Sequence, residues 1–229
     1  MRDSAAWAGA AAGIAGPVAF TGAWIVSSLR QTGHPAAEIQ ISGLAAPDAR
    51  DPWIMIAGFL VLGGCSVAFG SALRDALGGR ARAGLAPVLI QGAGLATIAA
   101  GLLRRDHMLL THGSVSWHNH AHDVISAAIY LDLVVVQVLL ASRFGREPRT
   151  GEPDWRPWRR WLLAGAVATA AVLAAFAADT SAPDAGVLQR VAVTIPLAAT
   201  AAVAARLVRT AGSGLALHGI GRLIAGDRQ

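Results

Sequence analysis

Histidines are concentrated in one short stretch of this chain. Five of the seven lie between positions 104 and 126, namely His107, His112, His118, His120 and His122. On a helix, His118 and His122 project from the same face because they are four residues apart, while His120 and Asp123 point to the other side. Two imidazoles at that spacing can bind one zinc ion. We therefore take His118 and His122 as candidate metal ligands.

A zinc ion bound by this pair would need a third protein ligand. Asp106, His107 or His112 could supply it, as could the first two apolar segments of the chain. Zinc with an open fourth position activates water, which is the chemistry of a hydrolase. In that case we expect Asp106 to act as third ligand or as base, with Ser126 in support at the edge of the same helical face. The alternative is that the histidines are hydrated side chains of a loop and a first helical turn.

Asp132 is an ionisable residue inside an apolar segment. It follows His122 by ten residues, which on a helix is about 15 Å, so the two cannot bind the same ion. A charged side chain within a membrane helix is costly and usually faces the interior of the bundle. Gln91 lies at a comparable depth in the preceding apolar segment, so we expect Asp132 to donate a hydrogen bond to Gln91 or to a backbone carbonyl. Such a pair could form a polar cavity or proton relay, or it could simply link two helices.

The composition indicates the environment that positions these residues. Of the 229 residues, 54% are hydrophobic and only 14% are charged, and the mean hydropathy is +0.49. Soluble domains usually carry about a quarter charged residues, so the chain is expected to be an integral membrane protein. The single Cys65 excludes a disulfide within one chain.

The intervals between charged residues predict the membrane spans, because about 20 apolar residues cross a bilayer as a helix. Six such intervals lie along the chain. We expect an all-α polytopic membrane bundle of six transmembrane helices, forming one domain over residues 1–229. The expected spans are approximately 6–28, 52–73, 84–103, 119–142, 161–178 and 186–207.

The arginines predict the orientation of the bundle. All 19 positive charges are arginine, a usage typical of a bacterial genome rich in G and C, and 14 of them lie at the termini and in the second and fourth connections. Cytoplasmic connections carry the excess of positive charge, so we expect both termini in the cytoplasm. The expected location of the protein is the cell (inner) membrane. Because the arginines fall between apolar runs, they indicate a lipid bilayer as partner and no nucleic acid.

Several short motifs resemble the bacterial six-span family called DUF998. The first two are 13–17 (GIAGP) in the first apolar segment and 41–44 (ISGL) in the loop that follows it. The others are 52–55 (PWIM) at the start of the second segment, 101–106 (GLLRRD) at the end of the third and 117–122 (WHNHAH) at the start of the fourth. The resemblance covers essentially the whole chain. It implies the six-helix fold and the membrane location and says little about chemistry. Members of the family tend to have a Pro-Thr-Asp turn where this chain has Arg104-Arg105-Asp106.

Two classes of function remain open at this point. The first is a membrane protein with a polar, histidine-lined cavity on its extracytoplasmic face, acting as a metal-assisted hydrolase of a lipid or lipid-linked substrate. The second is a non-enzymatic membrane protein that binds a small molecule or a partner. In the second class the same histidines are hydrated and hold no zinc.

Overall fold

The described part of the chain is helical throughout its regular structure. The computed structural model describes residues 2–226 except 34, 79–83, 110–114 and 147–153, and it describes side chains between residues 4 and 210. Within these residues there are six α-helices, one short 3-10 turn and no strand. The helices are α1 (Arg2–Arg30), α2 (Pro52–Ala76), α4 (Ala86–Leu102), α5 (Trp117–Phe144), α6 (Arg156–Ala178) and α7 (Ala185–Gly226), and the 3-10 turn η1 covers Ser42–Ala45. The predicted all-α class is confirmed.

Five of these helices are long and apolar enough to cross a membrane. They are α1, α2, α5, α6 and α7, the last over Ala185–Thr210. α4 is apolar but has only 17 residues, which corresponds to about 26 Å at the helical rise. Its N-terminal limit has a local cause, because Gly84 has a φ of +72° and Pro87 lies in the first turn, where a missing N–H costs nothing.

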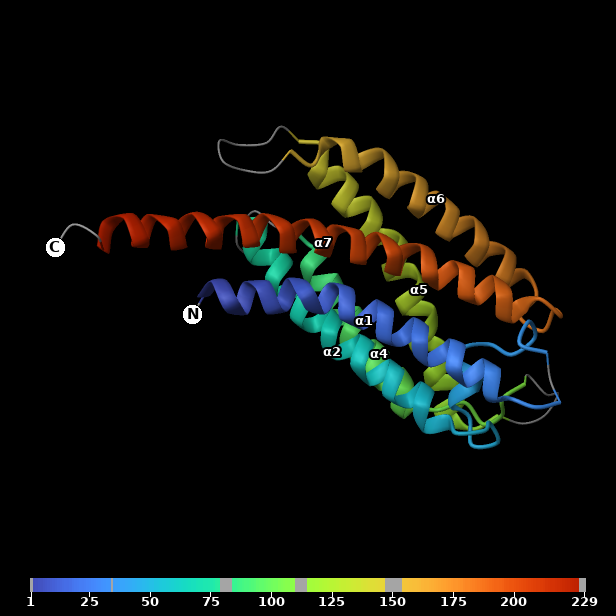
Figure 1. Cartoon of the computed structure of the whole chain (residues 1–229). Helices are drawn as coiled ribbons and strands as arrows, with labels where there is room; N and C mark the ends of the chain where they lie inside the picture. The colour runs from blue at the N-terminus through green and yellow to red at the C-terminus, as the bar shows by residue number, and fades with distance from the viewer. Residues whose placement is uncertain (1, 34, 79–83, 110–114, 147–153, 227–229) are drawn as a thin grey trace.

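The six helices form a closed ring in chain order. Each one packs against the next, and α7 packs against both α6 and α1. Successive helices run in opposite directions, so the start of α1 and the end of α7 lie at the same end of the bundle (Figure 1). The opposite end carries the segments that join α1 to α2, α4 to α5 and α6 to α7.

Small residues let the first three helices approach closely. A Cβ on Gly63 of α2 would lie 2.5 Å from the carbonyl oxygen of Gly94 in α4, and a Cβ on Gly13 of α1 would lie 2.5 Å from the Phe69 ring of α2. Lipid is as apolar as the helices, so close packing of this kind is a main source of helix association in membranes.

A loop between α1 and α2 folds down onto the bundle. Ile39 and Leu44 of this loop are completely buried, in an apolar cluster with Met55 and Phe59 of α2. Arg190 of α7 anchors the loop to the bundle by donating a hydrogen bond from Nη1 to the Ile39 carbonyl at 2.9 Å. The loop therefore forms one wall of the bundle interior at this end.

Candidate functional site

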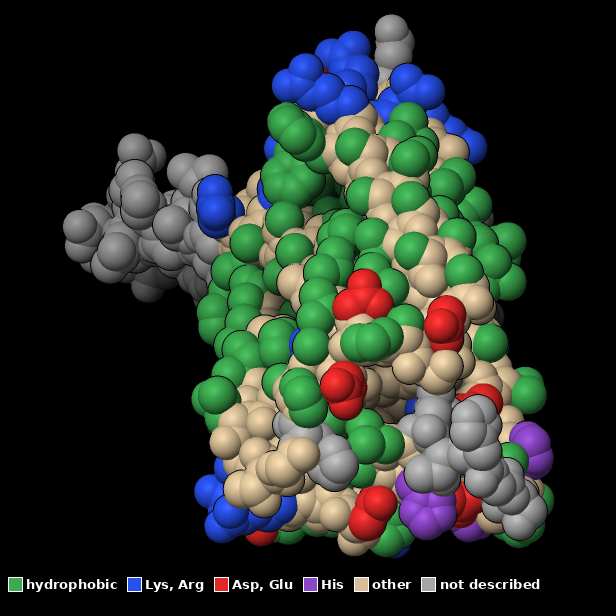
Figure 2. Space-filling view, turned by 90° about the vertical axis from the view of Figure 1, so that its right-hand side faces the viewer, with side chains coloured by type: hydrophobic (Ala, Val, Ile, Leu, Met, Phe, Trp, Pro, Cys, Tyr) green, Lys and Arg blue, Asp and Glu red, His purple; other side chains and the backbone are tan. Residues whose placement is uncertain are grey.

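A cavity opens at the end of the bundle that carries these loops. It lies among α5, α6, α7 and the loop after α1, and its volume is ≈ 480 Å³, within the range typical of ligand pockets. Its wall is rich in polar side chains, namely Gln40, Ser42, Arg105, His122, Asp123, Ser126, Tyr130, Thr180 and Gln189. Figure 2 views the molecule from this side and shows acidic and histidine side chains gathered around the lower part of the face, well away from the arginines at its top.

Arg105 is a buried cation on the wall of this cavity. Arg105 is only 6% exposed, and its Nη1 donates to Oε1 of Gln40 at 2.7 Å. Gln40 is itself fixed, because its Nε2 donates to the Thr180 carbonyl at 2.8 Å. The Nε of Arg105 is buried and has no hydrogen-bond partner; its nearest acid is Asp123, whose Oδ1 lies 4.0 Å away. That distance is too long for a hydrogen bond, so one donor of a buried guanidinium is free.

His122 is the second buried polar side chain with a free atom. It is 2% exposed, and its Nδ1 lies 2.9 Å from the Ala100 carbonyl and 2.8 Å from the Leu103 carbonyl. Both oxygens are acceptors at the C-terminal end of α4, so Nδ1 must carry the proton and donate. The neutral ring then presents a lone pair at Nε2, which is buried and has no partner.

Asp106 and His118 belong to a separate cluster at the start of α5. The two carboxylate oxygens of Asp106 accept hydrogen bonds from the backbone N and the Oγ of Ser116, each at 2.7 Å. These two bonds hold the pKa of Asp106 below its ordinary value. His118 lies with Nδ1 3.1 Å from the Arg104 carbonyl and Nε2 3.5 Å from Oδ1 of Asp106. Ser116 caps the helix by accepting from the backbone N of Asn119 at 3.3 Å.

The candidate metal residues are thus distributed over two environments. His122 and Ser126 line the cavity, whereas both ring nitrogens of His118 face the Asp106 cluster. His107 lies near Asp48, with Nδ1 3.6 Å from the carboxylate, and His112 lies outside the described residues. Among the residues that the structure describes, no group of three or more His, Cys, Asp or Glu side chains is arranged to hold a metal ion.

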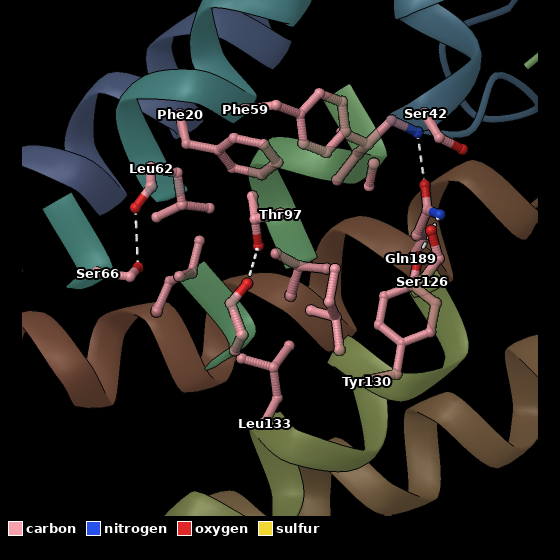
Figure 3. Close-up of a pocket in the computed structure, with 16 residues that line it drawn as sticks. Phe20, Ser42, Phe59, Leu62, Ser66, Thr97, Ser126, Tyr130, Leu133 and Gln189 are labelled. Carbon is pink, nitrogen blue, oxygen red and sulfur yellow. Dashed lines mark hydrogen bonds between the residues drawn. The ribbon is translucent and has the colours of Figure 1, made fainter. Parts of the chain in front are cut away.

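A smaller apolar pocket adjoins the polar cavity. Its volume is ≈ 80 Å³, and it is lined mainly by apolar side chains of α1, α2, α4, α5 and α7. Ser42, Ser126, Tyr130 and Gln189 line both spaces. Figure 3 shows Gln189 between the loop and Tyr130: its Oε1 accepts from the Ile41 backbone N, and its Nε2 donates to the Tyr130 hydroxyl at 2.6 Å. The polar cavity and the apolar pocket therefore share a wall formed by these four residues.

Gln91 forms its hydrogen bonds with α2. Gln91 donates from Nε2 to Oγ of Ser71 at 2.8 Å and to the Val67 carbonyl at 3.4 Å, both on α2. It turns to α2 because α2 and α4 pack closely there, and a Cβ on Gly70 would lie 2.6 Å from Cγ of Gln91. Asp132 is half-buried and lines a separate small cavity of ≈ 40 Å³ beside Gln137.

Sequence reasoning missed most of the cavity wall. Arg105 was counted only as a charge in a connection, and Asp123 was expected to point away from the site, whereas it lines the cavity. Gln40 and Gln189 drew no attention, because single glutamines in loops and helices carry no signal. One clue was present: Arg105 and Arg190 are arginines on the side expected to be poor in positive charge, and both have partners inside the protein.

Comparisons with known proteins bear on the family alone. No curated protein and no solved structure matches the chain. Residues 14–206, which is most of the chain, match a family described as "Protein of unknown function (DUF998)". The motifs quoted above fall almost entirely within this range, and the chain belongs to the DUF998 family.

Proposed function

We propose that this membrane protein binds an amphiphilic small molecule. The polar end of the ligand occupies the cavity beside Arg105 and His122, and its apolar part lies in the adjoining apolar pocket and against α5 and α6. The observation that carries the proposal is that two residues of one cavity wall, Arg105 and His122, each have a buried polar atom without a partner, Nε and Nε2 respectively.

Leaving such atoms without a hydrogen-bond partner costs free energy. A buried donor or acceptor without a partner costs about 1–3 kcal/mol, and a charged group costs more. Native proteins keep few of them, and each one has a reason. Here the donor and the acceptor belong to residues that line the same cavity, so a ligand whose complementary groups reach both atoms would satisfy both at once.

The apolar surroundings favour an amphiphile over a fully polar ligand. The cavity wall includes Leu173 and Phe176 of α6 beside the polar groups, and the apolar pocket shares four residues with the cavity. Five helices are apolar enough to cross a bilayer, which supports contact between the protein and lipid. A lipid or lipid-like molecule is therefore the class of ligand that matches both spaces.

Native mass spectrometry of the purified full chain tests this proposal. We expect a membrane lipid to remain bound in gentle detergent and to be lost in Arg105→Gln. Arg104→Gln is the matched control, because it removes the same charge from the neighbouring residue, which does not line the cavity. Equal lipid retention in the wild type and both variants would overturn the proposal.

The metal-assisted hydrolase is a second candidate, supported by one feature of His122. Its Nδ1 is anchored by carbonyl oxygens, an arrangement that also orients metal-bound histidines and leaves Nε2 available. His118 would have to leave Asp106 to join it. Metal analysis of chelator-washed protein decides: stoichiometric zinc that disappears in His118→Ala and His122→Ala supports the enzyme, and metal-free protein of unchanged stability argues against it.

A further inference from the structure

We propose that the ligand of this cavity has a zwitterionic head, with a phosphate and a protonated primary amine, as in phosphatidylethanolamine. This inference rests on the proposed function and adds the chemical class of the ligand. It follows from the charges on the cavity wall, the positions of the free atoms and the apolar surface beside them.

The phosphate belongs at Arg105. A guanidinium binds a phosphate through neighbouring N–H groups, and its charge makes these hydrogen bonds stronger than neutral ones. Gln40 occupies Nη1 and holds the side chain in place, while Nε remains free and buried. Because Gln40 is anchored to Thr180, the guanidinium is held in position before any ligand arrives.

The same cavity wall offers two acceptors for the amine. The lone pair at Nε2 of His122 is free, and Asp123 turns Oδ1 toward Arg105 at 4.0 Å while its Oδ2 accepts from Asn119 at 2.9 Å. A primary ammonium carries three donors. It can therefore bond to the imidazole and to the carboxylate, which a choline head without N–H groups cannot do.

The net charge of the cavity wall disfavours lipid head groups that carry a net charge. The titratable side chains that line the cavity among the described residues are Arg105, His122, Asp123 and Tyr130. With a neutral imidazole and a neutral phenol, one positive and one negative charge remain, so the wall is neutral overall. A zwitterion leaves the site neutral, whereas an anionic head such as phosphatidylglycerol adds a negative charge next to Asp123 with no cation to balance it.

Competition between lipid heads on the wild-type chain is the first test. Short-chain phosphatidylethanolamine, phosphatidylcholine and phosphatidylglycerol, matched in chain length, are added to delipidated protein in detergent and quantified by native mass spectrometry. We expect phosphatidylethanolamine to bind about tenfold or more tightly than the other two, since phosphatidylcholine leaves the buried His122 acceptor without a donor and phosphatidylglycerol leaves the Asp123 carboxylate without a cation. Glycerophosphoethanolamine, which has the head without the chains, should compete only weakly.

A charge variant is the second test. Asp123→Asn makes the wall positive, so its preference should shift from phosphatidylethanolamine toward phosphatidylglycerol. Asp184→Asn is the matched control, because Asp184 is exposed at the same end of the bundle and does not line the cavity.

The outcomes separate the two proposals. Lipid binding that depends on Arg105 but is as tight for phosphatidylcholine or phosphatidylglycerol overturns this inference and leaves the proposed function intact. Binding that is indifferent to Arg105 overturns both. A soluble head that competes as well as the lipid shows that the chains contribute nothing, which also overturns the lipid assignment. The wild-type comparison needs no variant. It can therefore still refute the inference if Asp123→Asn does not fold.

Discussion

His122 has two roles that its two ring nitrogens separate. Nδ1 closes the C-terminal end of α4 by donating to two carbonyl oxygens, and Nε2 is buried without a partner in a residue that lines the cavity. The first role is structural and fixes the tautomer that the second role requires. A histidine chosen from the sequence for its HxxxH spacing thus proves to be anchored to another helix rather than paired with His118.

Replacing His122 should destabilise the bundle even without any ligand. His122→Leu leaves the Ala100 and Leu103 carbonyls without this donor, and we expect a loss of about 1–3 kcal/mol in the free energy of unfolding. Thermal unfolding in detergent measures it. His120→Leu is the control, since His120 is exposed on the same turn; an equal loss in both variants would contradict the anchoring role.

Asp106 predicts a pH dependence at the start of α5. Its pKa is lowered from 3.8 mainly by the backbone and hydroxyl bonds from Ser116. A lowered pKa in the folded state means that the ionised carboxylate stabilises the fold at neutral pH, and that this contribution disappears as the pH falls through the folded pKa. Asp106→Asn should therefore unfold at a lower temperature than wild type at pH 7.

The same comparison at low pH provides the check on Asp106. Once the pH is well below 3.8, both side chains are uncharged, and the unfolding temperatures of wild type and Asp106→Asn should converge. A constant gap between them across the pH range would show that the carboxylate charge contributes nothing at this position.

At the scale of elements, the sequence predicted the helices better than the loops. Charge-free intervals mark the helices because each must hide its backbone from lipid. No comparable rule covers the loop after α1, whose Ile39 and Leu44 are buried by contacts with residues far along the chain. For the same reason the cavity was only half foreseen: His122 and Ser126 lie on a predicted helical face, while Arg105, Gln40 and Gln189 meet through tertiary packing.

The contact between α2 and α4 should be sensitive to a single methyl group. Gly63→Val places side-chain atoms against the Gly94 carbonyl and Ile98, where even a Cβ would lie 2.5 Å from either. We expect a loss of about 1–3 kcal/mol, the usual cost of overpacking. Gly64→Val is the control, since a Cβ at Gly64 meets nothing within 4 Å. Thermal unfolding of the two variants should differ clearly, and equal stability would contradict the close contact.

At the scale of the whole molecule, the ring arrangement explains where the site lies. Six helices that pack mainly against their neighbours in the ring enclose an interior, which loops and side chains must fill. At the end carrying the Asp106 cluster the interior is filled by the loop after α1, and the polar cavity remains between that loop and α5, α6 and α7. The other end is closed by an apolar cluster that includes Phe69, Phe144 and Trp155.

The arginines predict the orientation of this ring in the membrane. Fourteen of the 19 lie at the two termini and in the connections at the same end. Of the five at the cavity end, Arg105 and Arg190 bond to groups inside the protein and Arg30 donates to Asp51 at 2.7 Å. The excess of arginine at the end with the termini predicts that this end lies in the cytoplasm.

Cysteine labelling tests this orientation directly. Both labelling variants are made in a Cys65→Ala background, which removes the native thiol. Ser181→Cys places a thiol in the exposed loop between α6 and α7, at the cavity end. Ser4→Cys places a thiol in the first turns of α1, at the other end. A membrane-impermeant maleimide added to intact cells should label Ser181→Cys, and it should label Ser4→Cys only after permeabilisation, because the arginine-rich end stays in the cytoplasm. The reverse pattern would mean that the cavity opens to the cytoplasm and that its ligand is taken from the inner leaflet of the bilayer.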